Sequence, residues 1–299
     1  MKEVYTLEDL SSRAVLDAGA DKPARLAVIG HPIAHSASPR MHQAALDACG
    51  VAARYIRVDV EPGHVAEAFE RMRALGFIGC NVTVPHKLEA MLHCAVSPSA
   101  QALGAVNTLC FEGNEARGYN TDGPGFKNAI EHDFGLPLAS LMVVILGAGG
   151  GAGQAIAGQC VMLGVPKLVV VNRSLEKLGP LLERLRALNS KTQVIALSLE
   201  DPALVKYALA AELVVNTSSV GLKAGDPSIL PISCLKPEHL VYDTIYQPAV
   251  TPLLALAQAV DCRTSNGKSM LLHQGALAFQ LWFPEAQPLS PMGKALGIT

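Results

Sequence analysis

Hydrophobic and polar positions divide this chain into two kinds of segment. Short, unbroken apolar runs such as Leu141–Leu146 and Leu168–Val171 have the length of strands that are buried on both faces of a parallel sheet. Amphipathic segments such as Val65–Leu75 have the pattern of helices with one buried face. Because the two kinds alternate along the chain, we predict an α/β fold built on parallel strands.

The first of these apolar runs leads into a glycine-rich turn. Gly147, Gly149 and Ala152 match the spacing G-x-G-x-x-G/A of dinucleotide-binding turns. The first glycine allows a tight turn, the second lets the backbone approach a pyrophosphate, and the small Ala152 lets the next helix lie close to the sheet. The helix predicted over Gly153–Leu163 then directs its free N–H groups at the phosphates. We therefore expect a dinucleotide site rather than a purely structural turn.

The residues after the second strand of this region indicate which dinucleotide binds. Enzymes that use NAD place an acid there for the ribose hydroxyls, whereas cationic groups suit the 2′-phosphate of NADP. Asn172 occupies the acid's place and is followed by Arg173 and Ser174. Lys177 lies one turn later, and Glu176 is its neighbour. This combination favours NADP.

The chain before the glycine turn predicts a second group of strands, at Arg25–Gly30, Arg54–Val60 and Gly79–Val84. Residues 1–24 predict a short helix with an ill-ordered lead-in. Ser36 and Ser38 precede a helix expected over Arg40–Cys49. Two hydroxyls beside a helix N-terminus suit a small anion such as a carboxylate, although Ser38 is also a suitable helix cap.

Polar residues gather at the end of the third strand. Strand alternation places Asn81 and Thr83 on one face. Pro85 ends the strand, so that Lys87 stands where the next helix is expected to begin. The helix dipole repels a lysine there, so this position calls for an acid nearby, unless the lysine is a solvated surface charge. Asp122 is a candidate for that acid, and its other interpretation is the cap of the helix that follows it.

Two amide side chains are further candidates for ligand binding. Asn107 follows the small residues of Gly104-Ala-Val and precedes a threonine. Gln274 is a polar residue on an otherwise apolar helix that runs from the turn at Gly267 towards Phe283. Either amide satisfies the protein backbone or reaches a hydroxyl of a ligand.

The composition of the chain argues against several classes of protein. With 299 residues, 50% hydrophobic content and a net charge of −2, the chain has room for two domains and lacks the basic runs of nucleic-acid-binding proteins. It has neither a signal-peptide pattern nor an apolar stretch of about 18 to 20 residues that could span a bilayer. The seven cysteines are scattered without a Cys-x-x-Cys pair, which favours reduced thiols in the cytoplasm over a metal or disulfide framework. We therefore expect no metal site, no nucleic acid and no membrane partner.

In their order and spacing, these segments resemble the shikimate dehydrogenase family over residues 26–283. The motifs that carry the resemblance are Ser36-Ala-Ser38-Pro39, Asn81-Val-Thr83-Val-Pro-His-Lys87, Gly104-Ala-Val-Asn107-Thr108, Asn120-Thr-Asp122-Gly, the glycine turn, Asn172-Arg173-Ser174, Asp243-Thr-Ile-Tyr246-Gln-Pro and Gly267-Lys-Ser-Met270-Leu-Leu-His-Gln274.

The resemblance implies an NADP-dependent oxidoreductase that interconverts 3-dehydroshikimate and shikimate, a step in chorismate and aromatic amino acid biosynthesis. It implies an N-terminal α/β substrate-binding domain, formed by residues 1–121 and 268–299, and a Rossmann-type, doubly wound NADP-binding domain over residues 122–267. Lys87 and Asp122 are then the catalytic acid/base pair, and hydride comes from NADPH. The partner is a small molecule, and the protein is a monomer or a homodimer.

Carried over motif by motif, the resemblance also implies two sets of binding residues. Those expected at the substrate are Ser36, Ser38, Asn81, Thr83, Lys87, Asn107, Asp122, Tyr246 and Gln274. Those expected at the cofactor are Gly147, Ala148, Gly149, Gly150, Gly151, Ala152, Asn172, Arg173, Ser174, Lys177, Ser218, Gly267 and Met270.

Three other interpretations are open. A quinate/shikimate dehydrogenase that uses NAD is the nearest, and an acid at positions 172–174 would favour it. A folate-linked methylene dehydrogenase shares the two-domain architecture and a catalytic lysine, but the Ser-x-Ser-Pro and Gln274 motifs argue against it. A cofactor-binding regulator without turnover is the third, and the presence of both Lys87 and Asp122 argues against it.

Overall fold

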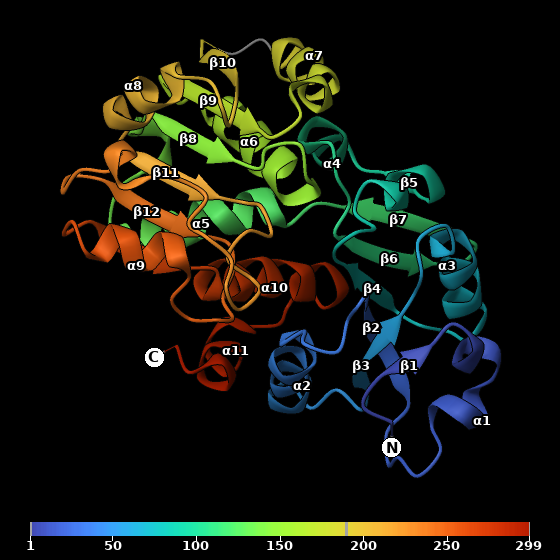
Figure 1. Cartoon of the computed structure of the whole chain (residues 1–299). Coiled ribbons are helices and arrows are strands. Elements are labelled where there is room, and N and C mark those ends of the chain that lie inside the picture. The colour runs from blue at the N-terminus through green and yellow to red at the C-terminus, as the bar shows by residue number, and fades with distance from the viewer. Residues whose placement is uncertain (1, 189–190, 299) are drawn as a thin grey trace. The chain divides into compact units, whose positions relative to one another are not determined.

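The computed structural model describes residues 2–188 and 191–298, which form two compact units (Figure 1). Unit 1 contains the chain up to residue 101, residues 105–121 and the chain from 271 onwards, and unit 2 contains residues 102–104 and 122–270. The long segments of the two units meet at 121/122 and at 270/271. The division into a substrate-binding domain (1–121 and 268–299) and an NADP-binding domain (122–267) stays a prediction. Residues 1, 189–190 and 299 of the predicted domains lie outside the described residues.

Unit 1 is built on a sheet whose strand order is β1-β3-β2-β4-β6-β7-β5. The strands are β1 (Tyr5–Thr6), β2 (Ala24–Gly30), β3 (Arg54–Asp59), β4 (Gly79–Val82), β5 (Ala95–Val96), β6 (Thr108–Glu112) and β7 (Glu115–Tyr119). The first four neighbours are parallel, whereas β6 is antiparallel to both β4 and β7. The three predicted strands are present as β2, β3 and β4, and β4 ends before Thr83.

Helices cover both faces of this sheet. The helices of unit 1 are α1 (Arg13–Leu16), α2 (Ser38–Ala48), α3 (Val65–Ala74) and α11 (Leu289–Leu296), while α4 (Pro98–Leu103) and α10 (Lys268–Trp282) each contribute residues to both units. Helix α3 packs its buried Phe69 and Met72 on one face. Helices α2, α10 and α11 pack on the other, where Met41, Phe279 and Met292 are buried. Alternate residues of β2 face the two cores, as the pleat of a strand requires.

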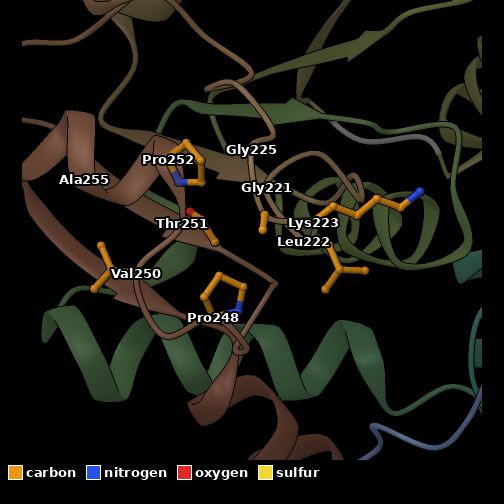
Figure 2. Close-up of a pocket in the computed structure, with 10 residues that line it drawn as sticks. Gly221, Leu222, Lys223, Gly225, Pro248, Val250, Thr251, Pro252 and Ala255 are labelled. Atoms are coloured by element: carbon orange, nitrogen blue, oxygen red, sulfur yellow. The ribbon is translucent and has the colours of Figure 1, made fainter.

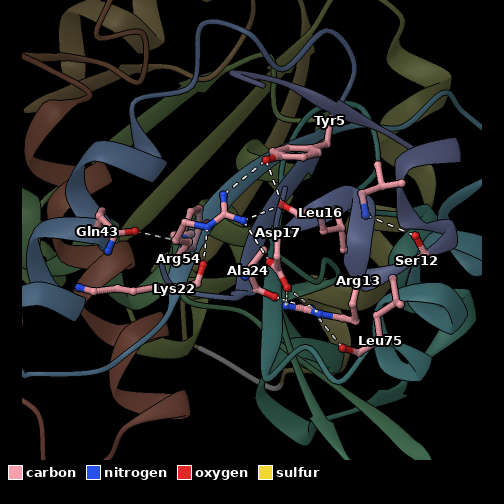
Figure 3. Close-up of polar contacts among 12 residues, drawn as sticks. Tyr5, Ser12, Arg13, Leu16, Asp17, Lys22, Ala24, Gln43, Arg54 and Leu75 are labelled. Carbon is pink, nitrogen blue, oxygen red and sulfur yellow. Dashed lines mark hydrogen bonds and ion pairs between the residues drawn. The ribbon is translucent and has the colours of Figure 1, made fainter. Parts of the chain in front are cut away.

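Residues 2–24 are part of this unit, so for these residues the expectation of an ill-ordered lead-in is wrong. Strand β1 pairs in parallel with β3. The side chain of Arg54 donates to the carbonyl oxygens of Leu16 and Lys22, at 2.6 and 2.7 Å, and to the carboxylate of Asp17 at 3.1 Å (Figure 3). Asp17 also binds Arg13 at 2.7 Å. The polar composition that suggested disorder instead satisfies backbone groups of the segment.

Unit 2 is a parallel sheet with strand order β10-β9-β8-β11-β12-β13. Its strands are β8 (Val143–Leu146), β9 (Lys167–Asn172), β10 (Gln193–Ser198), β11 (Leu213–Asn216), β12 (Leu240–Asp243) and β13 (Arg263–Asn266). Numbered from its own first strand, this is the order 3-2-1-4-5-6 of dinucleotide-binding folds. The order reverses between β8 and β11, and ligands of such sheets bind at the carboxyl ends of the strands at that point.

Helices also lie on both faces of the unit 2 sheet. They are α5 (Asp122–Phe134), α6 (Gly151–Leu163), α7 (Gly179–Ala187), α8 (Ala203–Ala210) and α9 (Pro252–Gln258). Helices α5, α6 and α7 share a core with Val143 and Ile145 of β8. Helices α8 and α9 share the opposite core with Val144 and Leu146. The unbroken apolar run of β8 is therefore explained by burial on both faces, as predicted.

Within residues 2–188 and 191–298, no helix is both long and apolar enough to cross a membrane. All seven cysteines lie in this part of the chain, and each is a free thiol.

Candidate active site

The glycine turn of unit 2 is held tightly against its neighbours. The N–H groups of Gly147 and Ala148 both donate to the carbonyl of Val171 in β9, at 2.8 and 3.1 Å. Gly147 has a φ of +81°, and a Cβ there would lie 2.8 Å from Cβ of Ser218, in the loop after β11. The two loops on either side of the point where the strand order reverses are thus in contact, and only glycine at 147 leaves room for it.

The next residues of the turn leave the start of α6 open. We call Gly147–Gly151 the phosphate loop. A Cβ at Gly149 would lie 3.2 Å from the amide of Asn172, and one at Gly150 would meet only the carbonyl of Gly147, at 3.6 Å. Within the described residues, no side chain caps α6, and the backbone N–H groups of Gly151 and Ala152 have no acceptor. Free N–H groups at a helix N-terminus beside a bare backbone fit the diphosphate of a dinucleotide.

The close approach of α6 to the sheet occurs at Gly153, and not at Ala152 as the motif suggested. A Cβ at Gly153 would lie 2.7 Å from Cα of Ala148, from the carbonyl oxygen of Gly147 and from Oγ1 of Thr217. Ala152 is half-buried. The helix starts at Gly151, two residues before the predicted start, so the position that faces the strand is shifted. This explains why the segment contains an additional glycine.

Cationic groups lie at the end of β9. The amide of Asn172 donates to the carbonyl of Ser174 at 2.8 Å. Arg173 and Lys177 are exposed, and neither pairs with a carboxylate of any described residue. Glu176, also exposed, makes no ion pair within the same part of the chain. Two available cations beside Asn172 suit a 2′-phosphate.

A buried polar network joins the exit loops of β11 and β12. The amide of Asn216 donates to both carboxylate oxygens of Asp243 at 3.1 Å, and Thr251 donates to the same carboxylate at 2.7 Å. Ser218 donates from its hydroxyl to Asn216 at 2.7 Å. Burial raises the pKa of the Asp243 carboxyl. The network fixes the loop that touches Gly147. Sequence reasoning did not find it, because its members lie far apart along the chain.

These loops also border a hollow of about 540 Å³ (Figure 2). Its walls come from the segment after β11, which includes Leu222 and Lys223, and from the segment after β12, which includes Pro248, Val250 and Thr251. None of the predicted site residues lines it.

Gly267 packs against the backbone after β12, and Met270 is bonded to a side chain of β12. A Cβ at Gly267 would lie 2.0 Å from the carbonyl oxygen of Thr244, so only glycine fits there. The N–H of Met270 donates to the hydroxyl of Tyr242 at 3.1 Å, and that hydroxyl lies 3.0 Å from the hydroxyl of Ser269. Tyr246 follows in the β12 exit loop and is half-buried.

In unit 1, the two serines lie at the start of α2. Helix α2 begins at Ser38, and no described side chain caps it, so the interpretation of Ser38 as the cap is wrong. Instead, the N–H of Ser38 donates to the hydroxyl oxygen of Ser36 at 3.3 Å. Arg57 of β3 donates to the carbonyl of Ser36 at 2.7 Å from Nη2. The hydroxyl of Ser38 is therefore not used as a cap, which is consistent with an anion-binding role beside Ser36.

An amide and hydroxyl network lies at the ends of β4 and β6. Asn107 accepts from the N–H of Thr121 at 2.8 Å and donates to the side chains of Thr121, at 2.9 Å, and Gln274, at 3.3 Å. Gln274 also donates to the carbonyl of Leu271 at 2.9 Å. Unit 1 thus brings together two of the predicted amides, from segments separated by more than half of the chain. Sequence reasoning did not assign a role to Thr121.

Asn81 belongs to the same network but has little capacity left for a ligand. Its amide nitrogen donates to the carbonyl of Asn107 at 3.2 Å and to the hydroxyl of Thr108 at 3.0 Å. Its oxygen accepts from the hydroxyl of Tyr55 at 2.7 Å. Both amide hydrogens are therefore used within the protein. Tyr55 was not predicted, because an aromatic residue in a strand has no local signal other than packing.

Lys87 lies within a turn rather than at the start of a helix. The turn spans residues 84–88, and a short 3-10 helix begins only at Glu89, so the predicted position at a helix N-terminus is wrong. The carbonyl of Lys87 accepts from the N–H of Val106 at 3.0 Å, which joins this turn to the segment that carries Asn107. The Lys87 side chain is half-buried, as is that of Thr83.

Asp122 is the first residue of α5 and of the long segment of unit 2. Lys87 belongs to unit 1. His86, which precedes Lys87, is fully buried, with Nε2 2.6 Å from the carbonyl oxygen of Val60.

Known proteins resemble this chain over most of its length. The model of the shikimate dehydrogenase substrate-binding domain matches residues 28–109. A shikimate dehydrogenase (NADP(+)) of Moorella thermoacetica is 41% identical over 274 residues, which cover 91% of this chain and 92% of that protein.

Solved structures of related enzymes are similar to this chain in fold as well. The shikimate 5-dehydrogenase of Thermus thermophilus, in complex with NADP(H) and shikimate, has a TM-score of 0.80 at 36% identity and covers 92% of this chain and 98% of its own. The quinate dehydrogenase of Corynebacterium glutamicum, in complex with NAD, has a TM-score of 0.82 at 30% identity, with coverages of 93% and 100%. The fold class predicted from the sequence, a substrate domain plus a Rossmann-type domain, is confirmed. The chain therefore belongs to the shikimate dehydrogenase family.

Proposed function

We propose that this protein is an NADP-dependent shikimate dehydrogenase, which reduces 3-dehydroshikimate to shikimate in the biosynthesis of chorismate and aromatic amino acids. The observation that carries the proposal is the phosphate loop at the strand reversal of unit 2, with its bare glycine backbone and the free N–H groups of α6. Arg173 and Lys177 beside it, which make no ion pair with a described residue, favour NADP over NAD.

The polar network of unit 1 supports a hydroxylated acid as the substrate. Ser36 and Ser38 bind the carboxylate in this proposal, while Asn107 and Gln274 bind ring hydroxyls. At 3.3 Å, the bond between these two amides is longer than the 2.8 and 2.9 Å bonds between Asn107 and Thr121, and it is the one that a substrate hydroxyl replaces. Asn81 positions Thr108 and Asn107 rather than meeting the substrate, because both of its amide hydrogens are already donated. Thr83 and Tyr246 border the ring.

NADPH, when bound, supplies the hydride to the ketone carbon. Negative charge then develops on the ketone oxygen, so a positioned acid must deliver a proton to it. We assign this proton transfer to the Lys87 ammonium, which accepts the proton in the reverse direction. Asp122 orients Lys87 and the ring hydroxyl, and it offsets the lysine's charge. Gly147 to Ala152, Asn172 to Ser174, Lys177 and Ser218 hold the cofactor, with Gly267 and Met270 on its nicotinamide side.

Initial rates with each cofactor and each substrate test this function. In the oxidative direction, shikimate or quinate is combined with NADP⁺ or NAD⁺. Of these four pairs, shikimate with NADP⁺ should give the highest kcat/KM. Quinate with NAD⁺ as the best pair would replace the proposal with the quinate dehydrogenase alternative. Tight NADPH binding without turnover of either acid would indicate a regulator.

We further propose a cytoplasmic location, since seven free thiols are maintained in a reducing compartment. The partner is the small-molecule substrate, and size-exclusion chromatography distinguishes the two predicted states of the protein, a monomer and a homodimer.

A further inference from the structure

We propose that Gln154 and Arg184 form a clamp behind the phosphate loop, and that Arg184 is a positioning residue for NADPH that acts through Gln154. This inference rests on the proposed function. Neither residue belongs to the cofactor set predicted from the sequence.

The clamp consists of one amide that is held at both ends. Nη2 of Arg184, on α7, donates to Oε1 of Gln154 at 3.0 Å. Nε2 of the same amide donates to the carbonyl oxygen of Gly149 at 3.1 Å. Helix α7 is thereby connected to the middle of the phosphate loop through a single side chain of α6.

The bond to Gly149 determines the orientation of a whole peptide unit. Since a peptide is planar, fixing the carbonyl of Gly149 also fixes the N–H of Gly150, which donates to the carbonyl of Gly147 at 3.1 Å. The Gly149–Gly150 peptide is therefore held at both ends before any ligand arrives. Glycine residues otherwise have the largest conformational freedom, so this is where a clamp has the greatest effect on the order of the loop.

The guanidinium of Arg184 is confined and lacks a counter-ion. A Cβ at Gly104 would lie 2.1 Å from Cζ of Arg184, so the guanidinium packs directly on the backbone there. Its Nε is buried without an acceptor, and no carboxylate within the described residues pairs with it. Among the described residues, the guanidinium has one hydrogen-bond partner, Gln154, and no counter-ion, so it acts on the loop through that bond and favours anionic ligands nearby.

Helix α7 also supplies a matched control. Arg186 lies two residues after Arg184, is exposed, and its guanidinium makes no hydrogen bond to a described residue. Arg186→Gln removes the same charge from the same helix without touching the clamp.

The test is calorimetric titration of NADPH into the wild-type protein and the variants Gln154→Ala, Arg184→Gln, their double variant and Arg186→Gln. We expect each single clamp variant to bind NADPH about five- to tenfold more weakly, which corresponds to the loss of one positioning hydrogen bond. The double variant should be no more than about twofold weaker than either single variant, because both act through one contact. Arg186→Gln should bind like the wild type.

Gln154→Glu separates the two ends of the clamp. A glutamate still accepts from Arg184 but has no hydrogen to donate to Gly149, so it should lose as much NADPH affinity as Gln154→Ala. In steady-state kinetics, the variants should raise KM for NADPH while leaving kcat and KM for 3-dehydroshikimate unchanged. A general structural defect would instead lower kcat and the melting temperature and raise both KM values.

Three results would overturn the inference: wild-type affinity in both single variants, fully additive losses in the double variant, or wild-type affinity in Gln154→Glu. If the wild-type protein itself fails to bind NADPH, the proposed function fails with it. If the wild type binds NADPH and the clamp variants bind equally well, only the clamp is wrong.

Discussion

Gly147 lies directly against Ser218: a Cβ added to the glycine would come within 2.8 Å of both the Cβ and the backbone nitrogen of the serine. The two residues follow β8 and β11, the neighbouring strands between which the strand order reverses. Ser218 is itself fixed, because its hydroxyl donates to Asn216 and Asn216 binds the buried Asp243. The phosphate loop is therefore shaped by a rigid neighbour.

Gly147→Ala should weaken NADPH binding at least tenfold and lower the free energy of unfolding by about 1 to 3 kcal/mol, because alanine is strained at positive φ and its Cβ meets Ser218. Gly164→Ala is the matched control, since Gly164 has a φ of +73° at the end of α6 but no atom within 4 Å of the added Cβ. It should lose stability only. Urea denaturation and NADPH titration measure the two effects, and wild-type NADPH affinity in Gly147→Ala would contradict this account of the loop.

Lys87→Met should reduce kcat by about two to four orders of magnitude, because general acid–base catalysis by a positioned side chain contributes that much. The affinity for NADPH should not change, since Lys87 is assigned to the substrate alone. Lys206→Met, at an exposed position on α8, controls for the loss of one positive charge. A Lys87→Met protein with an unchanged melting temperature and near-normal turnover would remove Lys87 from the mechanism.

Asp122→Asn should lower kcat by about one to two orders of magnitude, because the amide has the same shape but cannot offset the charge of the lysine. KM for shikimate should rise as well, since a hydroxyl acceptor is weakened. Glu131→Gln, on the same helix and paired with Lys127 at 2.7 Å, should leave both parameters unchanged. Equal kinetics for the two variants would show that Asp122 only begins the helix.

Arg173→Ala and Lys177→Ala should each weaken NADPH binding by about tenfold while leaving NADH binding unchanged, because a hydrogen bond to a charged group contributes about 1.5 to 3 kcal/mol. NADH lacks the 2′-phosphate and is therefore the internal control. Parallel losses for both dinucleotides would mean that these cations do not recognise the 2′-phosphate.

His42 should make the stability of the protein depend on pH. The ring is fully buried and stacks on Tyr55 at 4.4 Å, and burial lowers its pKa from 6.5 to about 3. Among the described residues, neither ring nitrogen has a hydrogen-bond partner. The folded protein keeps this ring neutral while the unfolded chain takes up a proton below pH 6.5. The contribution of His42 to the free energy of unfolding is therefore fully present above pH 6.5. It is lost as the pH falls towards 3, by about 1.4 kcal/mol per pH unit.

Urea denaturation of the wild type and of His42→Phe between pH 7 and pH 4 isolates this contribution, since phenylalanine keeps an aromatic ring without a titrating group (about 1.4 kcal/mol per pH unit separates the two slopes). His64→Gln, at an exposed position, serves as the control and should follow the wild type. Identical pH slopes for the wild type and His42→Phe would show that His42 does not carry this dependence.

Local errors in the sequence interpretation have identifiable causes. Ser38 was expected to cap α2, but the helix includes Ser38, because helix boundaries are decided by competing backbone bonds over one or two residues. Lys87 was expected at a helix start, but the turn after β4 is followed by a short 3-10 helix that begins at Glu89. In both cases the local conformation predicted from the sequence was wrong, while the role of the residue in the site stays a prediction.

The sequence by itself determined the features that depend on neighbours along the chain. A few consecutive residues are enough to recognise the apolar run of β8, the glycines after it and the cations after β9. The α/β fold and the phosphate loop could therefore be predicted. Only the tertiary structure decided which distant side chains meet. Tyr55 with Asn81, Asn107 with Gln274, and Arg184 with Gln154 are pairs whose partners lie on different elements. A hydrogen bond requires the donor and acceptor atoms to lie within about 3 Å of each other. The hydrophobic periodicity of a segment predicts its secondary structure, but it contains no information on the distance from that segment to another one.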